Sequence, residues 1–157
     1  MSSYWKRFVF IYSALLLGAL AAYAVADERK ELHLPPGPIK ERHELMEGVG
    51  KNAERIGNAL KANKPEEAAA PAEAIAGVME KFTTLFPPGS THPDSRAKPE
   101  IWKQKEKFDQ DAADMRAKAL AFADVAKSGG DAKAASRALW GGCKTCHESF
   151  RVPKPGE

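Results

Sequence analysis

Two cysteines and a histidine stand close together near the C-terminus, in the segment Cys143-Lys144-Thr145-Cys146-His147. They follow the pattern C-x-x-C-H, which is the signature of covalent haem attachment. Two thiols add to the two vinyl groups of haem, and the imidazole that follows binds the iron. On a helix these positions are i, i+3 and i+4, so all three side chains project from one face. We therefore expect one haem c, held by Cys143 and Cys146, with His147 as an axial ligand of its iron.

Other uses of the cysteine pair fit the sequence less well. A redox C-x-x-C site usually follows a strand in a βαβ unit, and no strand pattern occurs near Cys143. A structural zinc site needs four ligands, and no second Cys or Cys/His pair stands at a suitable spacing. A disulfide is the simple alternative for an exported chain with two cysteines. The histidine directly after Cys146 favours haem over the disulfide.

The N-terminus has the pattern of a secretory signal. Lys6 and Arg7 precede an uncharged, apolar run, and Ala24-Val25-Ala26 supplies the small residues of a cleavage site. This pattern predicts a signal peptide over residues 1–26 and one folded domain over residues 27–157. The alternative is an uncleaved anchor, since the uncharged run has about 19 residues, close to the length of a spanning helix. In both cases we expect the folded part in the periplasm, with membrane contact only if the segment stays uncleaved.

Composition limits the classes of partner. Hydrophobic residues make up 43% of the chain and charged residues 29%, which is ordinary for a globular domain. The formal net charge is +3, and loss of Lys6 and Arg7 with the signal would leave the chain close to neutral. Proteins that bind nucleic acid usually carry a strongly basic face. We therefore expect no nucleic-acid partner.

Four segments repeat apolar residues at the spacing of a helix face: 39–60, 66–86, 99–126 and 131–150. Proline and glycine clusters separate them, and Asp131 is placed to cap the last segment. Amphipathic helices joined by short or medium connections form up-down-up-down bundles that can hold a cofactor in the core. The sequence therefore predicts an all-α, antiparallel four-helix bundle, with the haem in the bundle near the C-terminal helix.

Several stretches resemble class II cytochromes c, the cytochrome c′ family, over about residues 39–151. They are residues 42–46, 85–87, 98–102, 107–108 and 143–151. The resemblance implies a periplasmic four-helix bundle with a C-terminal haem motif. It also implies electron transfer with periplasmic redox partner proteins, and an antiparallel homodimer. We expect no enzymatic activity, because peroxidase-like chemistry needs a distal acid–base group and His43 is the only, and a poor, candidate nearby.

The family has two branches that differ at the distal face of the haem. In one, the iron is five-coordinate; in the c-556 type, a methionine of the first helix is the sixth ligand. Met46 stands at that position, and residues 45–52 are more similar to the c-556 type. The resemblance thus implies a low-spin electron carrier ligated by His147 and Met46. The alternative is a five-coordinate protein that binds nitric oxide or carbon monoxide, with Met46 as a core residue.

The roles of several other residues follow from the resemblance or from their spacing. Arg42 matches a family arginine near the haem propionates, and a solvated helix charge is the alternative. Met79 and Met115 are expected at the core or its boundary. Three aromatic residues are expected to pack near the haem or between helices: Trp102, Phe108 and Phe150.

Overall fold

Each of the four predicted segments forms a long helix. The computed structural model describes residues 33–153, so the predicted signal and its boundary at Asp27 lie outside the described residues. The four long helices are α2 (Pro38–Lys61), α3 (Ala69–Phe82), α5 (Lys105–Lys127) and α6 (Ala132–Phe150). None of the helices within residues 33–153 is both long and apolar enough to cross a membrane.

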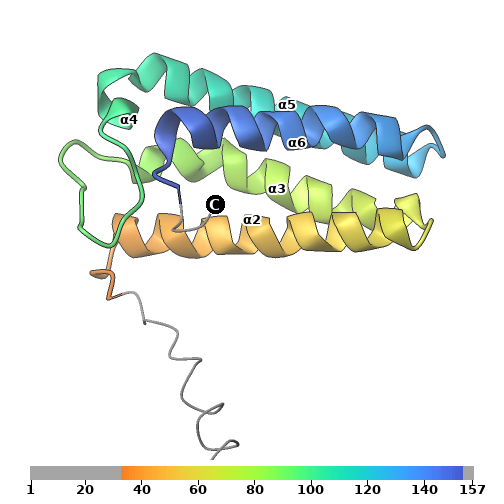
Figure 1. The fold of residues 1–157 in the computed structure, drawn as a ribbon, viewed down its shortest axis with the longest axis horizontal. Helices are drawn as coiled ribbons and strands as arrows, with labels where there is room; N and C mark the ends of the chain where they lie inside the picture. The colour runs from red at the N-terminus through yellow and green to blue at the C-terminus, as the bar shows by residue number, and fades with distance from the viewer. Residues whose placement is uncertain (1–32, 154–157) are drawn as a thin grey trace, which may run out of the picture. The chain divides into compact units, whose positions relative to one another are not determined.

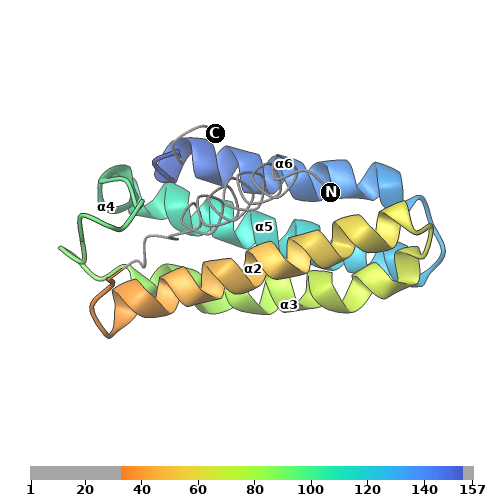
Figure 2. The same ribbon diagram turned by 60° about the horizontal axis from the view of Figure 1, so that its bottom comes forward.

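The four helices lie side by side and alternate in direction (Figure 1). α3 packs on α2 and on α5, and α5 also packs on α6, whereas α2 and α6 approach each other at few positions. In both views the first turns of α2 and the last turns of α6 lie at the same end of the bundle (Figures 1 and 2). The predicted up-down-up-down fold is confirmed.

The core lies where the apolar spacing predicted it. The buried residues of α5 form one face of that helix: Phe108, Ala112, Met115, Ala119, Phe122, Ala123 and Ala126. α2 contributes Val49, Ile56 and Ala59 to the same core. Met79 and Met115 are 8% and 5% exposed, so both are core residues as predicted. Alanine is frequent at these positions, and its small side chain lets neighbouring helices approach closely.

The helix ends follow local chemistry. Gly37 precedes Pro38 at the start of α2 with φ of 104°, a conformation that favours glycine, while proline suits a first turn. Asn63, just after α2, has φ of 57°, which asparagine tolerates better than most residues. The Asp131 carboxylate accepts a 2.8 Å hydrogen bond from the Ala134 N–H at the start of α6, so the predicted cap is confirmed.

The third predicted helix is broken rather than continuous. A short helix, α4 (Glu100–Lys103), ends at Gln104, which has φ of −129° and ψ of 49° before α5 begins. Ile101 is buried at 2% exposure, and the Trp102 indole N–H donates to the Pro87 carbonyl oxygen at 3.0 Å. These contacts fix α4 to the preceding loop. A seven-residue apolar spacing from Ile101 to Phe108 is compatible with one straight helix, so spacing alone could not reveal the break.

The second helix is shorter than its predicted range of 66–86. Its regular part spans Ala69–Phe82, with short 3₁₀ segments before it (η1, Pro65–Ala68) and after it (η2, Thr83–Leu85). Pro71 lies in the first turn of α3, where proline is tolerated. An apolar pattern cannot separate a 3₁₀ turn from an α-helical turn, because both present neighbouring residues on one face over so short a length.

The long loop after η2 holds the end of α6. The Lys98 N–H donates to the Phe150 carbonyl at 2.9 Å, and the Val152 N–H donates to the Arg96 carbonyl at 2.8 Å. The Lys98 Nζ also donates to the Glu148 carbonyl at 2.7 Å. These bonds fix the last turn of α6, which begins at the last residue of the C-x-x-C-H segment.

Candidate haem-binding site

The three side chains of the C-x-x-C-H segment lie on the last two turns of α6. Cys143, Cys146 and His147 are all half-buried, and both cysteines pack against the hydrophobic core. The two cysteines are free thiols rather than a disulfide. Because helical spacing of i, i+3 and i+4 gives one face, two thiols and one imidazole are presented together, as haem attachment requires.

α6 approaches α5 closely where the motif begins. A Cβ atom at Gly142 would lie 2.8 Å from the Met115 Sδ and 3.2 Å from a carbon of the Lys118 side chain. The Cys143 Sγ lies 4.0 Å from the Met115 Sδ. Closer to the end of α6, the Phe150 ring packs against the Phe108 ring of α5, with the ring centroids 5.1 Å apart. Sulfur and aromatic groups therefore surround the attachment face on the α5 side.

The surroundings of the thiols hold them in the protonated form. Burial raises the pKa of the Cys143 thiol. The pKa of Cys146 is raised to about 11, mostly by burial and to a smaller extent by the Asp111 carboxylate and by Cys143, while Lys107 has a smaller opposing effect. Removal of water disfavours the charged thiolate. The site is thus apolar enough to receive a large hydrophobic cofactor.

Met46 lies on the core-facing side of α2. Its side chain is half-buried and packs against the core, beside Leu45 and one turn before the buried Val49. At a rise of 1.5 Å per residue, Met46 lies roughly 12 Å from the start of α2, and His147 lies roughly 5 Å from the end of α6. Since the start of α2 and the end of α6 share one end of the bundle, both residues belong to that end.

The residues present fit a haem. The donor set combines two thiols and one imidazole on a single half-buried face, and the side facing α5 is mainly apolar and aromatic, with one charged pair at its edge. α2 and α6 make few direct contacts, so a flat cofactor held by α6 would complete the packing between these two helices. A haem held there would be bound by Cys143 and Cys146, with His147 at the iron.

Arg42 has a structural role that the sequence did not reveal. It is 4% exposed, so the alternative of a solvated helix charge is wrong. Its guanidinium donates to the Leu85 carbonyl at 3.0 Å, to the Ser90 hydroxyl at 2.8 Å and to the Ser90 carbonyl at 2.6 Å. It also stacks 4.4 Å from the centre of the Phe86 ring, and burial lowers its pKa. Arg42 therefore anchors the loop to α2, and its contact with a haem propionate stays a prediction.

His43 lies near Met46 but pairs with its own helix. Its Nε2 is 3.5 Å from the Glu47 Oε1, and 36% of the His43 side chain is exposed. His43 therefore lies at the surface of α2. The aromatic residues Trp102, Phe108 and Phe150 pack in one cluster around Phe86 and Phe82, as predicted for packing residues.

A charged pair beside the motif was also missed by sequence reasoning. The Lys107 Nζ lies 2.6 Å from the Asp111 Oδ2, and the Asp111 side chain is only 15% exposed. Charged pairs of this spacing on a helix usually lie on a solvated face. Here the only signal was that Asp111 directly precedes the core residue Ala112, so it stands at the edge of the buried face.

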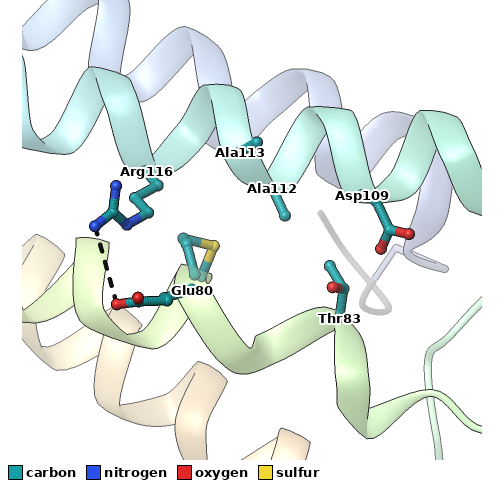
Figure 3. Close-up of a pocket in the computed structure, with 7 residues that line it drawn as sticks. Glu80, Thr83, Asp109, Ala112, Ala113 and Arg116 are labelled. Atoms are coloured by element: carbon teal, nitrogen blue, oxygen red, sulfur yellow. Dashed lines mark ion pairs between the residues drawn. The ribbon is translucent and has the colours of Figure 1, made fainter.

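A separate hollow of about 360 Å³ lies between α3 and α5 (Figure 3). It is lined by Met79, Glu80, Thr83, Asp109, Ala112, Ala113 and Arg116. An ion pair of 3.9 Å joins Arg116 to Glu80 at one end, and Asp109 lies at the other (Figure 3). No residue of the C-x-x-C-H segment lines this hollow, so it is distinct from the haem site.

Several known proteins are similar to this chain in sequence and fold. A family model described as Cytochrome C′ matches residues 37–151. Cytochrome c′ of Pararhodospirillum photometricum is 34% identical over 122 residues, which cover 74% of this chain and 98% of that protein. Cytochrome c-556 of Agrobacterium fabrum is 29% identical over 148 residues, which cover 92% of this chain and 95% of that protein. The structure of cytochrome c′ from Rhodopseudomonas palustris superposes with a TM-score of 0.68 at 30% identity, covering 77% of this chain and 100% of that one.

Proposed function

Because the chain belongs to the cytochrome c′ family, we propose that it is a single-electron carrier whose haem iron is ligated by His147 and Met46. Proteins of this family bind one haem c covalently, and both cysteines of this chain lie in the attachment segment. The haem, when bound, supplies a one-electron change between ferric and ferrous iron.

Different side chains would contact the two faces of the cofactor. Cys143 and Cys146 would hold the edge of the haem through thioether bonds, and His147 would bind the iron from α6. Met46 would bind it from α2. α5 excludes water from the attachment face, because its buried side chains pack against α6 there. A site filled on both faces takes up and releases electrons with little rearrangement.

The position of Met46 is the observation that supports this proposal best. It is half-buried on the core-facing side of α2, at the end of the bundle where α6 carries His147. A thioether sulfur at the sixth position raises the reduction potential and leaves no open coordination site. Such a site suits electron transfer rather than catalysis.

Binding of carbon monoxide by the reduced protein tests the proposal. The wild-type protein should bind it slowly and weakly, because Met46 must first leave the iron. Met46→Ala should bind it at once. Met79→Ala is the matched control, since Met79 is a buried methionine on α3 that lines the separate hollow, and it should behave as wild type. Immediate binding by the wild-type protein would instead support the alternative, a five-coordinate cytochrome that binds carbon monoxide or nitric oxide.

We further propose that the chain works in the periplasm with redox partner proteins and as a homodimer. Residues 1–26 have the pattern of an export signal. The mass of the exported protein should match a chain that begins at Asp27, and the mass of the full chain would identify an uncleaved anchor.

Sedimentation of the loaded protein should give twice the monomer mass, and a monomer mass at all concentrations would contradict the dimer.

A further inference from the structure

The α5–α6 contact has a regular antiparallel register beside the haem-attachment segment. Met115 on α5 faces Cys143 on α6, with their sulfur atoms 4.0 Å apart. Further along, Lys107 on α5 faces Phe150 on α6, with the Lys107 Nζ 5.4 Å from the ring centre. About two turns of each helix separate these two contacts. Asp111 occupies the middle of that stretch on α5, and Cys146 occupies the middle of it on α6.

Asp111 therefore faces Cys146 across the helix contact. The electrostatics agree with this register, because the Asp111 carboxylate raises the pKa of the Cys146 thiol and Lys107 lowers it by a smaller amount. Both charges thus act on the residue that holds one edge of the haem. In the loaded protein the thiol becomes a thioether and no longer titrates, but the two charges of the α5 pair remain.

The two partners of this pair differ in exposure. The Asp111 side chain is 15% exposed and the Lys107 side chain 46%. Water screens an exposed charge more than a partly buried one, so the negative charge acts more strongly on the haem than the positive charge does. The pair therefore contributes a net negative potential at the attachment face.

We propose that Asp111 sets the reduction potential of the haem: its carboxylate stabilises the ferric over the ferrous state, and Lys107 partly offsets it. The reaction concerned is the gain of one electron from a redox partner by ferric iron, which gives ferrous iron. A nearby anion favours the more positive state of the iron. This inference rests on the proposed function and deepens it, because a set potential matters for an electron carrier.

The test is a redox titration of the haem-loaded protein against a mediator of known potential at neutral pH. Asp111→Asn should increase the equilibrium constant for reduction by about threefold or more, as expected for loss of one partly buried charge. Lys107→Gln should decrease the constant, since it leaves the carboxylate unopposed. Asp111→Glu keeps the charge and should stay near wild type.

The chain offers a matched control on the same helix. Lys105 and Asp109 form an ion pair of the same spacing at 2.5 Å, but Asp109 is 45% exposed and lines the hollow beside α3. Asp109→Asn should leave the equilibrium constant at the wild-type value. Equal constants for Asp111→Asn and Asp109→Asn would overturn the inference. So would an unchanged value in Lys107→Gln, and that variant decides the question if Asp111→Asn does not fold.

Two further measurements distinguish an effect of charge from a change in ligation or folding. The absorption spectra and thermal unfolding of the variants should match wild type, since a shift caused by altered ligation or local unfolding would change them. A high-spin spectrum in every variant and in wild type would contradict ligation by Met46. The comparison of equilibrium constants would still stand, because a charge acts on the iron whatever its spin state.

Discussion

At the scale of single residues, Cys146 shows how the fold prepares a side chain for haem attachment. Its type and spacing follow from the covalent chemistry, so the sequence predicts them directly. Its environment does not follow from the sequence: burial acts most strongly on the thiol, and the charged side chains that also act on it, Asp111 and Lys107, come from α5. Only the packing of two helices distant in sequence brings these groups together.

The raised pKa of Cys146 predicts a pH effect in the haem-free chain. The thiol shifts from an ordinary value of 9.0 to about 11 on folding, so the folded state holds this proton more tightly than the unfolded state. The contribution to stability is full below about pH 9 and is lost as the pH rises toward 11. The rate of Cys146 alkylation should rise with pH, with its midpoint near pH 11 in native buffer and near pH 9 in urea. The same midpoint in both solvents would contradict burial of the thiol.

Arg42 carries a second residue-scale prediction. Removing its guanidinium would leave three partly buried acceptors in η2 and the loop without their donor, and hydrogen bonds to a charged group contribute about 2 kcal/mol. Arg42→Met should lower the free energy of unfolding by about 2 kcal/mol in urea titration. Arg55→Met, at an exposed position of the same helix, should change it by less than about 0.5 kcal/mol. Equal effects would show that the loop contacts contribute nothing.

At the scale of helices, two neighbouring glycines of α6 differ in their surroundings: one is exposed, and the other packs closely against α5. Gly141 is exposed, and an added Cβ would meet nothing within 4 Å, whereas one at Gly142 would meet the Met115 Sδ at 2.8 Å. Alanine in place of glycine inside a helix stabilises it by roughly 0.5–1 kcal/mol. Gly141→Ala should raise the melting temperature, and Gly142→Ala should not, because Met115 must move. A similar rise in both variants in a thermal scan would contradict the close α5–α6 contact.

The helices show which structural features a single sequence can predict. Apolar spacing and the cap at Asp131 are local signals, and both predict the observed structure. The break at Gln104 occurs beside the hydrogen bond from Trp102 to Pro87, and Arg42 holds the loop through hydrogen bonds to Ser90. These contacts join residues distant in the chain, and no periodic pattern encodes them.

At the scale of the whole described unit, the topology accounts for the two faces of the haem site. Alternating helices place the start of α2 and the end of α6 at the same end of the bundle, so residues 46 and 147 share that end although they lie about a hundred positions apart. Because α2 and α6 make few direct contacts, a haem held by α6 would bridge them. The resemblance to the cytochrome c′ family predicted this fold and the attachment residues, and the family match confirms the family.

Ligation of the iron by both His147 and Met46 is the central claim, and the absorption spectrum of the oxidised, haem-loaded protein tests it most directly. Wild type should give a low-spin spectrum, and Met46→Ala should give a high-spin one. Met115→Ala, which removes a buried methionine beside Cys143, should keep the low-spin spectrum. A high-spin spectrum in the wild-type protein, unchanged in Met46→Ala, would contradict the claim.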